Sequence, residues 1–150
     1  LLTAVIEAFP NKRIRFYGIA THWYKGFWKW LTRKHRDIFT NRNGIAETLN
    51  KLYNESKVVL NIHHEQQTDG ANPKVYEIAA TGAYEICDRN TYIENLFPNG
   101  EIALYSDEKE LISCISRALW SNEVNGNTAM EIVRKSHSFE VRMKEMLERL

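Results

Sequence analysis

The sequence predicts an α/β fold with three layers: a mostly parallel sheet of about five strands with helices on both faces, followed by a helical C-terminal tail. Segments with strand-like and helix-like patterns alternate from Ile14 to Ser121. The largely apolar run KVVLNI at 57–62 is typical of a parallel strand covered on both faces. After Asp107 every patterned segment is helical. Right-handed crossovers between parallel strands then give a Rossmann-like arrangement.

The first 56 residues are expected to supply two helices and two short strands. Residues 1–9 have an apolar helix face that ends at a proline and an asparagine; its members are Leu1, Leu2, Val5, Ile6 and Phe9. RIRFYGI at 13–19 alternates and is rich in β-formers, which predicts a strand, and DIFTN at 37–41 is a second candidate. The aromatic-rich segment between them is compatible with an amphipathic helix or an irregular loop. IAETLNKLYNES at 45–56 has clear helical periodicity.

The remaining elements follow in a regular order. Strands are expected at 57–62, 83–88 and 102–106, and helices at 73–82, 91–100, 107–121, 125–135 and 138–150. Pro73 in the first turn and Gly82 at the end mark one helix clearly. Ser106 or Asp107 is expected to cap another, with Glu110 three residues after Asp107 as in a capping box.

Composition places the chain among ordinary globular proteins. The 150 residues suggest one domain, and 43% hydrophobic with 26% charged residues argues against disorder. A net charge of +1 gives no general reason to expect nucleic acid or an anionic membrane as a partner. No apolar run is long enough to span a bilayer. Cys87 and Cys114 are far apart and are expected to be reduced thiols, so a cytoplasmic location is expected. The opening in mid-pattern at Leu1 suggests a fragment of a longer protein.

The long polar segment after the strand at 57–62 is the strongest indication of a binding site. Ligands of open α/β sheets bind at the carboxyl ends of the strands, and the helix that begins near Asn72 directs its positive amino end to that edge. An anion such as a phosphate would suit this helix end, and Lys74 could add a charge to it. Glu77, one turn further, could accept hydrogen bonds from two hydroxyl groups. Asp69 lies eight residues before Glu77. A solvated Lys74 and a Glu77 without a partner are the alternatives.

Other residues give weaker indications. His63 and His64 are adjacent, and adjacent side chains leave a strand end in opposite directions, so a metal site is not expected. His22, after the first strand, could contact a ligand at the same edge, and Gly18 marks where that strand turns. The aromatic segment 23–30 could stack on nucleic acid, but packing or a domain interface is the preferred interpretation. The phosphate-binding and dinucleotide-binding glycine motifs are absent, as is the G-x-S-x-G nucleophile motif.

Several motifs, in order, resemble the C-terminal domain of CgeB-like, spore-protein-type glycosyltransferases of the two-domain GT-B architecture. They are Leu60-Asn61, Asn72-Pro-Lys-Val-Tyr-Glu77, Ala80-Thr-Gly82, Leu96-Phe-Pro-Asn-Gly100, Tyr105-Ser-Asp107 with Glu110-Leu111, and His137-Ser-Phe139 with Arg142. The resemblance runs from about Ser56 to the end. Before that it is thinner, although FYGIATHW is similar to the family's YG-x-x-W segment.

The resemblance implies a site for a nucleotide-sugar donor, formed by Gly18, His22, Asn61, Asp69, Asn72, Lys74 and Glu77. In related enzymes the second acid of an E-x7-E pair binds the ribose and the first contacts the sugar. Glu77 matches the second acid, whereas Asp69 replaces the first. Lys74 stands where the family usually has Arg, so a bidentate phosphate contact becomes a single one.

GT-B enzymes usually transfer sugars without a metal, so no cofactor or metal is expected. The acceptor site and any general base would come from an N-terminal domain absent from this chain, which alone is expected to bind and not to turn over. The alternative is a non-catalytic, glycosyltransferase-like interaction module with the segment 23–30 as its partner surface.

Overall fold

The computed structural model describes residues 1–17, 39–40, 46–63, 70–121 and 124–149. The chain divides into two compact units, Leu1–Leu49 and Asn50–Leu150. Both contain helices and parallel strands, which confirms the α/β class. The predicted sheet of about five strands is not shown, because the described strands form one sheet of two and one sheet of three.

The first unit holds a short helix and a two-stranded sheet. Helix α1 (Leu2–Ala8) buries Val5 and Ile6, as its apolar spacing predicts. Strands β1 (Phe16–Tyr17) and β2 (Phe39–Thr40) are parallel, with Phe16 opposite Phe39. The strand predicted at 13–19 therefore begins later than expected, since residues 13–15 are not in a strand. Gly18, His22 and the aromatic segment lie outside the described residues.

The second unit is built on a parallel sheet in the order β3-β4-β5. Its strands are β3 (Val58–Asn61), β4 (Tyr84–Asp88) and β5 (Ala103–Tyr105). The register pairs the last residue of β3, Asn61, with Cys87, and the last residue of β4, Asp88, with Tyr105. All three strands consequently end at one edge of the sheet.

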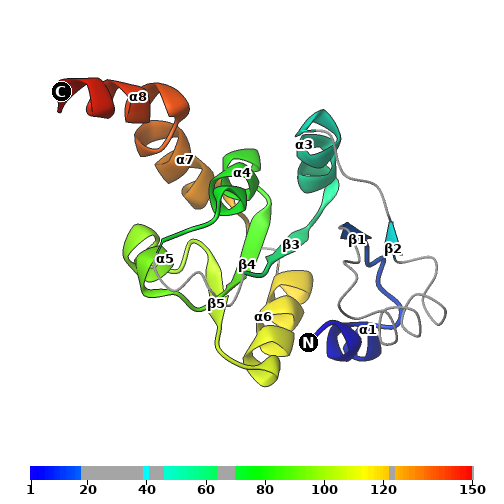
Figure 1. Ribbon diagram of the computed structural model, residues 1–150. Helices are drawn as coiled ribbons and strands as arrows, with labels where there is room; N and C mark the ends of the chain where they lie inside the picture. Colours follow the sequence, from blue (N-terminus) through cyan, green and yellow to red (C-terminus); the bar gives the residue numbers. More distant parts are fainter. Residues whose placement is uncertain (18–38, 41–45, 64–69, 122–123, 150) are drawn as a thin grey trace, which may run out of the picture. The chain divides into compact units, whose positions relative to one another are not determined.

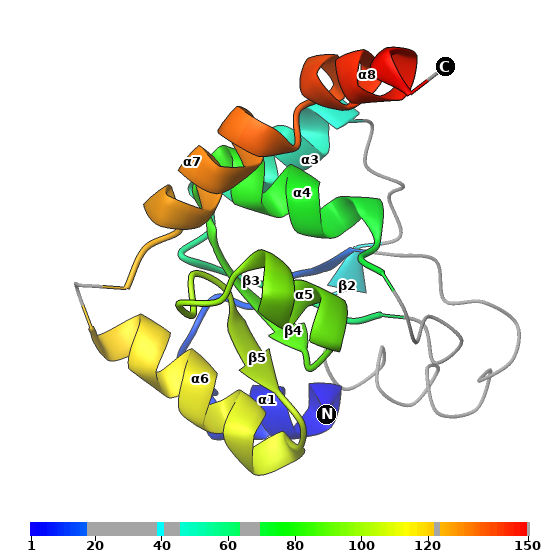
Figure 2. The same cartoon turned by 90° about the vertical axis from the view of Figure 1, so that its left-hand side faces the viewer.

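Helices lie on both faces of this sheet, as predicted. Helix α4 (Pro73–Thr81) packs against β4 and β3 on one face, with α7 (Asn127–Ser136) packed onto it. Helix α6 (Glu108–Trp120) lies on the opposite face, so that the sheet is the middle layer in Figure 2. The short helix α5 (Thr91–Leu96) connects β4 to β5. Figure 1 shows α8 (Phe139–Glu148) continuing from α7 at the end of the chain.

The core between α4, α5, α7 and the sheet is apolar. Its buried members are Val75, Ala79, Cys87, Ile93, Phe97, Ile102, Ala129 and Val133. These residues sit at the positions that helical and strand periodicity predicts to face inward. Residues Val75, Ile78 and Ala79 form the buried face of α4, which leaves Lys74 and Glu77 on its exposed face.

Helix α4 has the boundaries that its sequence signals predict. The Asn72 side chain accepts a hydrogen bond from the Val75 N–H, Pro73 occupies the first turn, and Gly82 ends the helix in the left-handed region at φ 79°. Helix α7 approaches closely here, because a Cβ on Gly126 would lie 2.3 Å from the carbonyl oxygen of Ala83. A glycine is therefore required at position 126.

Helix α6 confirms the predicted capping box with one difference. Asp107 accepts a hydrogen bond from the Glu110 N–H at 2.8 Å. The Glu110 carboxylate accepts at 2.7 Å from the N–H of Ser106, one residue before the cap. The reciprocal pair thus spans one residue more than the standard arrangement.

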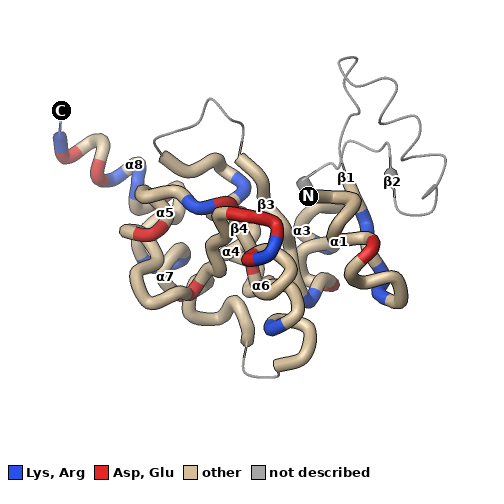
Figure 3. The backbone as a smooth tube through the Cα atoms, turned by 90° about the horizontal axis from the view of Figure 1, so that it is seen from below, with Lys and Arg blue, Asp and Glu red and all other residues tan. Residues whose placement is uncertain are grey.

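Charged residues are mixed in sign. Lys and Arg are interspersed with Asp and Glu along the described backbone (Figure 3), as the net charge of +1 suggests. None of the helices in the described ranges combines the length and the apolar character needed to cross a membrane.

Candidate functional site

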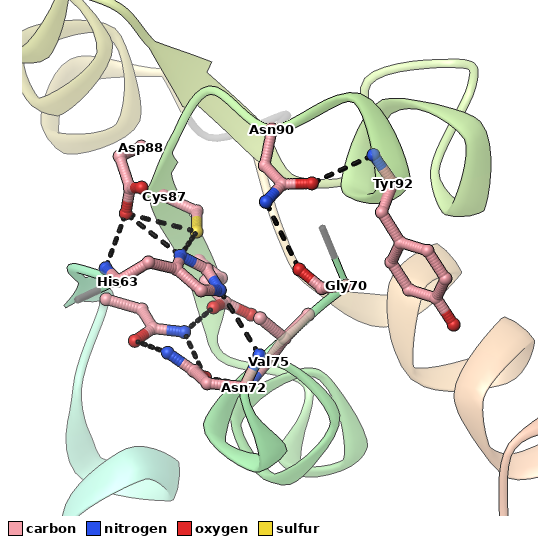
Figure 4. Close-up of polar contacts among 10 residues, drawn as sticks. His63, Gly70, Asn72, Val75, Cys87, Asp88, Asn90 and Tyr92 are labelled. Carbon is pink, nitrogen blue, oxygen red and sulfur yellow. Dashed lines mark hydrogen bonds and ion pairs between the residues drawn. The ribbon is translucent and has the colours of Figure 1, made fainter. Parts of the chain in front are cut away.

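The carboxyl edge of the three-stranded sheet gathers a network of buried and half-buried polar side chains. Asn61 is the last residue of β3, and His63 follows it by two residues. Asp88 ends β4, and Asn72 is the cap at the start of α4 (Figure 4). Asn61 and His63 lie two residues apart, so both face the same side, whereas Ile62 between them is 45% exposed. The network connects both strand ends to the amino end of α4.

Asn61 and Asn72 form a reciprocal amide pair. Each Nδ2 donates to the other residue's Oδ1 at 3.1 Å. The Asn72 Oδ1 also accepts from the Val75 N–H at 3.2 Å, so both of its lone pairs are used. The helix cap is therefore itself held in position by the last residue of β3.

Glu85, in the middle of β4, is the buried acid of this unit. Its side chain is 1% exposed, and its Oε1 accepts a hydrogen bond at 2.9 Å from the second proton of the Asn61 Nδ2. Its Oε2 has no partner among the described residues. Burial raises the pKa of Glu85 to about 8, and the hydrogen bond from Asn61 acts in the opposite direction by lowering it. A neutral carboxylic acid is favoured here around neutral pH.

His63 uses both ring nitrogens. The backbone N–H of Asn72 donates to its Nε2 at 3.3 Å, and its Nδ1 lies 3.0 Å from Oδ1 of Asp88. That carboxylate oxygen also accepts from the backbone N–H of His63 at 2.7 Å. The ring is buried, with 2% of its side chain exposed. His63 thus joins β3, β4 and the residue that caps α4.

The chain just before α4 is fixed from the other side by Asn90. The Nδ2 of Asn90 donates to the Gly70 carbonyl at 3.1 Å, and its Oδ1 caps α5 by accepting from the Tyr92 N–H at 2.8 Å (Figure 4). Gly70 has a φ of 97°, a conformation that side chains rarely adopt. Residues 70–72 are therefore held by side chains that follow two different strands.

His63, Cys87 and Asp88 bring three possible metal-ligand atoms within 4.8 Å of one another. The hydrogen-bond pattern does not suit a metal. The Asn72 N–H needs an unprotonated Nε2, so in the neutral ring the proton is on Nδ1, the nitrogen that a metal would need. Burial, then the charges of Glu85 and Asp88, raise the pKa of the Cys87 thiol, which keeps it protonated.

The last helix contacts α4 through a cation–π pair. The guanidinium carbon of Arg142 lies 4.6 Å from the centre of the Tyr76 ring, and the Tyr76 hydroxyl is 3.1 Å from that of Tyr92. The His137 ring is 5.6 Å from the Tyr76 ring. The separate motifs around Tyr76 and from His137 to Arg142 thus meet in space.

The structure places four of the seven predicted site residues. Asn61 and Asn72 are joined directly, and Lys74 and Glu77 lie together on the exposed face of α4. Glu77 is exposed. Burial, and then the charge of Glu77, raises the pKa of Tyr53. Gly18, His22 and Asp69 lie outside the described residues.

Sequence reasoning missed the role of four polar residues: His63, Glu85, Asp88 and Asn90. One signal was present for Glu85, since an acid within the otherwise apolar strand YEIC must be buried if the strand is central. The residues after a strand are also expected at the ligand edge, which would have indicated Asp88 and Asn90.

A comparison with protein families gives a match over residues 1–148 to a family described as glycosyl transferase-like. The chain belongs to this family. The match covers nearly the whole chain, including the first unit, for which the sequence resemblance was thinner. Comparisons with curated proteins and with solved structures found no significant match. The glycosyltransferase assignment is confirmed at the level of the family, and a role in glycosyl transfer follows in general terms.

Proposed function

We propose that this glycosyltransferase chain binds the nucleoside-diphosphate sugar that donates the sugar in a metal-independent transfer. The observation that carries the proposal is the position of α4: its amino end lies where β3 and β4 end, and Lys74 and Glu77 share its exposed face. The N–H of Lys74, at the second helical position, has no intrahelical acceptor and suits a phosphate oxygen. The CgeB-like subtype and the GT-B architecture are part of the same proposal.

The proposed chemistry follows from the charge that develops on the leaving group. The bond between the anomeric carbon and the diphosphate oxygen breaks, and its electron pair leaves with the nucleoside diphosphate. The acceptor nucleophile bonds to the same carbon and passes its proton to a general base, which is proposed to come from the acceptor domain. The helix dipole and the Lys74 ammonium stabilise the negative charge on the diphosphate. Glu77, one turn along, accepts hydrogen bonds from the ribose hydroxyls, which fixes the donor for attack.

The proposed roles divide between direct and indirect ones. Lys74 and Glu77 contact the donor, and Asp69 contacts the sugar. Asn72 caps the helix that binds the diphosphate, and Asn61 holds that cap. Gly18 and His22 are kept as proposed donor-binding residues. The acceptor site is assigned to another domain of the GT-B pair, and a cytoplasmic location is proposed with it.

Calorimetric titration of the full chain with UDP, GDP and dTDP tests the donor-binding role. The wild-type chain should bind at least one of them, and Glu77→Ala should weaken that binding by about 1–3 kcal/mol, because a charge-assisted hydrogen bond is lost. Glu131→Ala removes another exposed acid, on α7, and should leave the affinity unchanged. Equal affinity of Glu77→Ala and wild type would remove Glu77 from the site. A chain that binds no nucleotide would favour the non-catalytic interaction module.

A further inference from the structure

We infer that His63 is a positioning residue of the donor site: its ring anchors the Asn72 backbone N–H and so fixes the amino end of α4 against the ends of β3 and β4. The inference rests on the proposed function and adds a residue to it. His63 does not contact the donor in this scheme. It acts through Asn72, the last residue before the helix.

The hydrogen-bond pattern determines which ring nitrogen carries the proton. A backbone N–H can only donate, so the 3.3 Å contact from Asn72 makes Nε2 the acceptor. A neutral ring then has its proton on Nδ1, and Asp88 accepts it at 3.0 Å. A ring flipped about its own axis would lose both contacts. One tautomer and one orientation of the buried ring therefore satisfy all the partners.

One carboxylate oxygen of Asp88 contacts both the backbone and the ring of His63. Its Oδ1 accepts from the backbone N–H of His63 and from the ring, and the Cys87 Sγ lies 3.4 Å from the same Nδ1. The backbone contact fixes where the chain leaves β3, and the ring contact fixes the side chain. The position of His63 is thus set by β4, the central strand of this sheet.

The contact with His63 affects donor binding because it determines which backbone N–H groups at the start of α4 are left for the diphosphate. Pro73 has no N–H, so the Asn72 and Lys74 groups are consecutive donors at this helix end. With the Asn72 N–H bound to His63, the Lys74 N–H is the next backbone donor along the chain, and we assign it to the diphosphate. The Asn61–Asn72 amide pair fixes the side chain of the same residue. Misplacement of this end by about 1 Å would weaken every contact to the leaving group.

Two substitutions test the hydrogen bonds of the two ring nitrogens separately. His63→Gln places an amide oxygen near the position of Nε2, so it can accept from Asn72 but loses the ring contact to Asp88. His63→Asn places an amide N–H near Nδ1, so it can donate to Asp88 but leaves the Asn72 N–H without an acceptor. Both variants remove the imidazole, and each keeps one hydrogen bond.

The full chain of each variant is titrated with UDP, GDP and dTDP, and the exchange of the Asn72 amide proton is followed by NMR. We expect His63→Gln to keep the wild-type affinity within about threefold and His63→Asn to lose about tenfold or more, with faster Asn72 exchange only in His63→Asn. Thermal unfolding of both variants identifies any loss that comes from unfolding. A purely structural role would lower the stability of both variants without this order of affinities.

The outcomes for the two proposals can be told apart. If the wild-type chain binds none of the nucleotides, the proposed function fails and the donor-site role of His63 fails with it. If the wild type binds a nucleotide but His63→Gln and His63→Asn bind it with the same affinity as each other, only the inference about His63 is overturned. Should His63→Asn fail to fold, the ¹⁵N shifts of the wild-type imidazole decide: a protonated Nε2 overturns the inference, and an unprotonated Nε2 supports it.

Discussion

Removal of the buried carboxyl group of Glu85 should change how stability depends on pH. The perturbation is Glu85→Gln, which keeps the shape and the oxygen that accepts from Asn61 but cannot ionise. Burial raises the pKa of Glu85 from 4.5 to about 8. The folded chain therefore binds a proton at pH values where the unfolded chain has lost it. The contribution of Glu85 to stability is complete below about pH 4.5 and is lost as the pH rises towards about 8.

The size of the loss follows from these two pKa values. At about 1.4 kcal/mol for each pH unit between them, the free energy of unfolding falls by at most about 5 kcal/mol across the window. Relaxation of the site and entry of water towards the unpartnered Oε2 would reduce this to a few kcal/mol. Even the smaller figure is a large part of the stability of a typical domain.

Urea unfolding at several pH values between about 5 and 8 provides the assay. The free energy of unfolding of wild type minus that of Glu85→Gln should fall steadily as the pH rises, because groups common to both chains cancel. Glu131→Gln changes an exposed acid on α7 and should show no such trend. A difference between wild type and Glu85→Gln that stays constant across the window would refute the reasoning and show that Glu85 is ionised throughout.

Four further substitutions test capping, packing and a buried hydroxyl group by urea unfolding. Asn72→Ala removes the cap of α4 and the amide partner of Asn61. It should lower the free energy of unfolding by about 1–3 kcal/mol. Gly126→Ala should destabilise the chain by about 1–3 kcal/mol, because its Cβ would lie 2.3 Å from the Ala83 carbonyl oxygen. Gly100→Ala has open space around the added Cβ, so it should destabilise only through the backbone strain of a φ of 76°, by about 1 kcal/mol. Tyr105→Phe removes a buried hydroxyl that has no partner among the described residues, so stability should be unchanged or higher; a loss above about 1 kcal/mol would reveal a hidden partner.

The local signals of the sequence predicted both ends of α4 and the start of α6 well, whereas α5 ends at Leu96, four residues before the end expected at 100. Asn72, Pro73 and Gly82 mark α4, and Asp107 with Glu110 marks the start of α6. These signals work because caps and turns depend on backbone geometry within a few residues of one another. The parallel pairing of β3, β4 and β5 was predicted for a similar reason, since short strands joined through helices pair in parallel.

Polar residues were harder to interpret from the sequence. Glu77 and Glu85 both follow a tyrosine and precede an isoleucine, yet one is exposed and the other is 1% exposed. The difference in burial comes from residues distant in the sequence that pack around one glutamate and not around the other. Glu77 lies on the outer face of a helix, whereas Glu85 lies on the central strand between two others.

By itself the sequence determined the α/β class, the order of the described helices and strands, and membership of a glycosyl transferase-like family, because these depend on periodicity, turn residues and motifs carried along the chain. Only the tertiary structure decided which polar groups meet. His63 and Asp88 are 25 positions apart, and Asn61 and Glu85 are 24 apart. Their contacts exist because the parallel register brings the ends of β3 and β4 to one edge. Burial there turns ordinary polar side chains into a network that holds the amino end of α4.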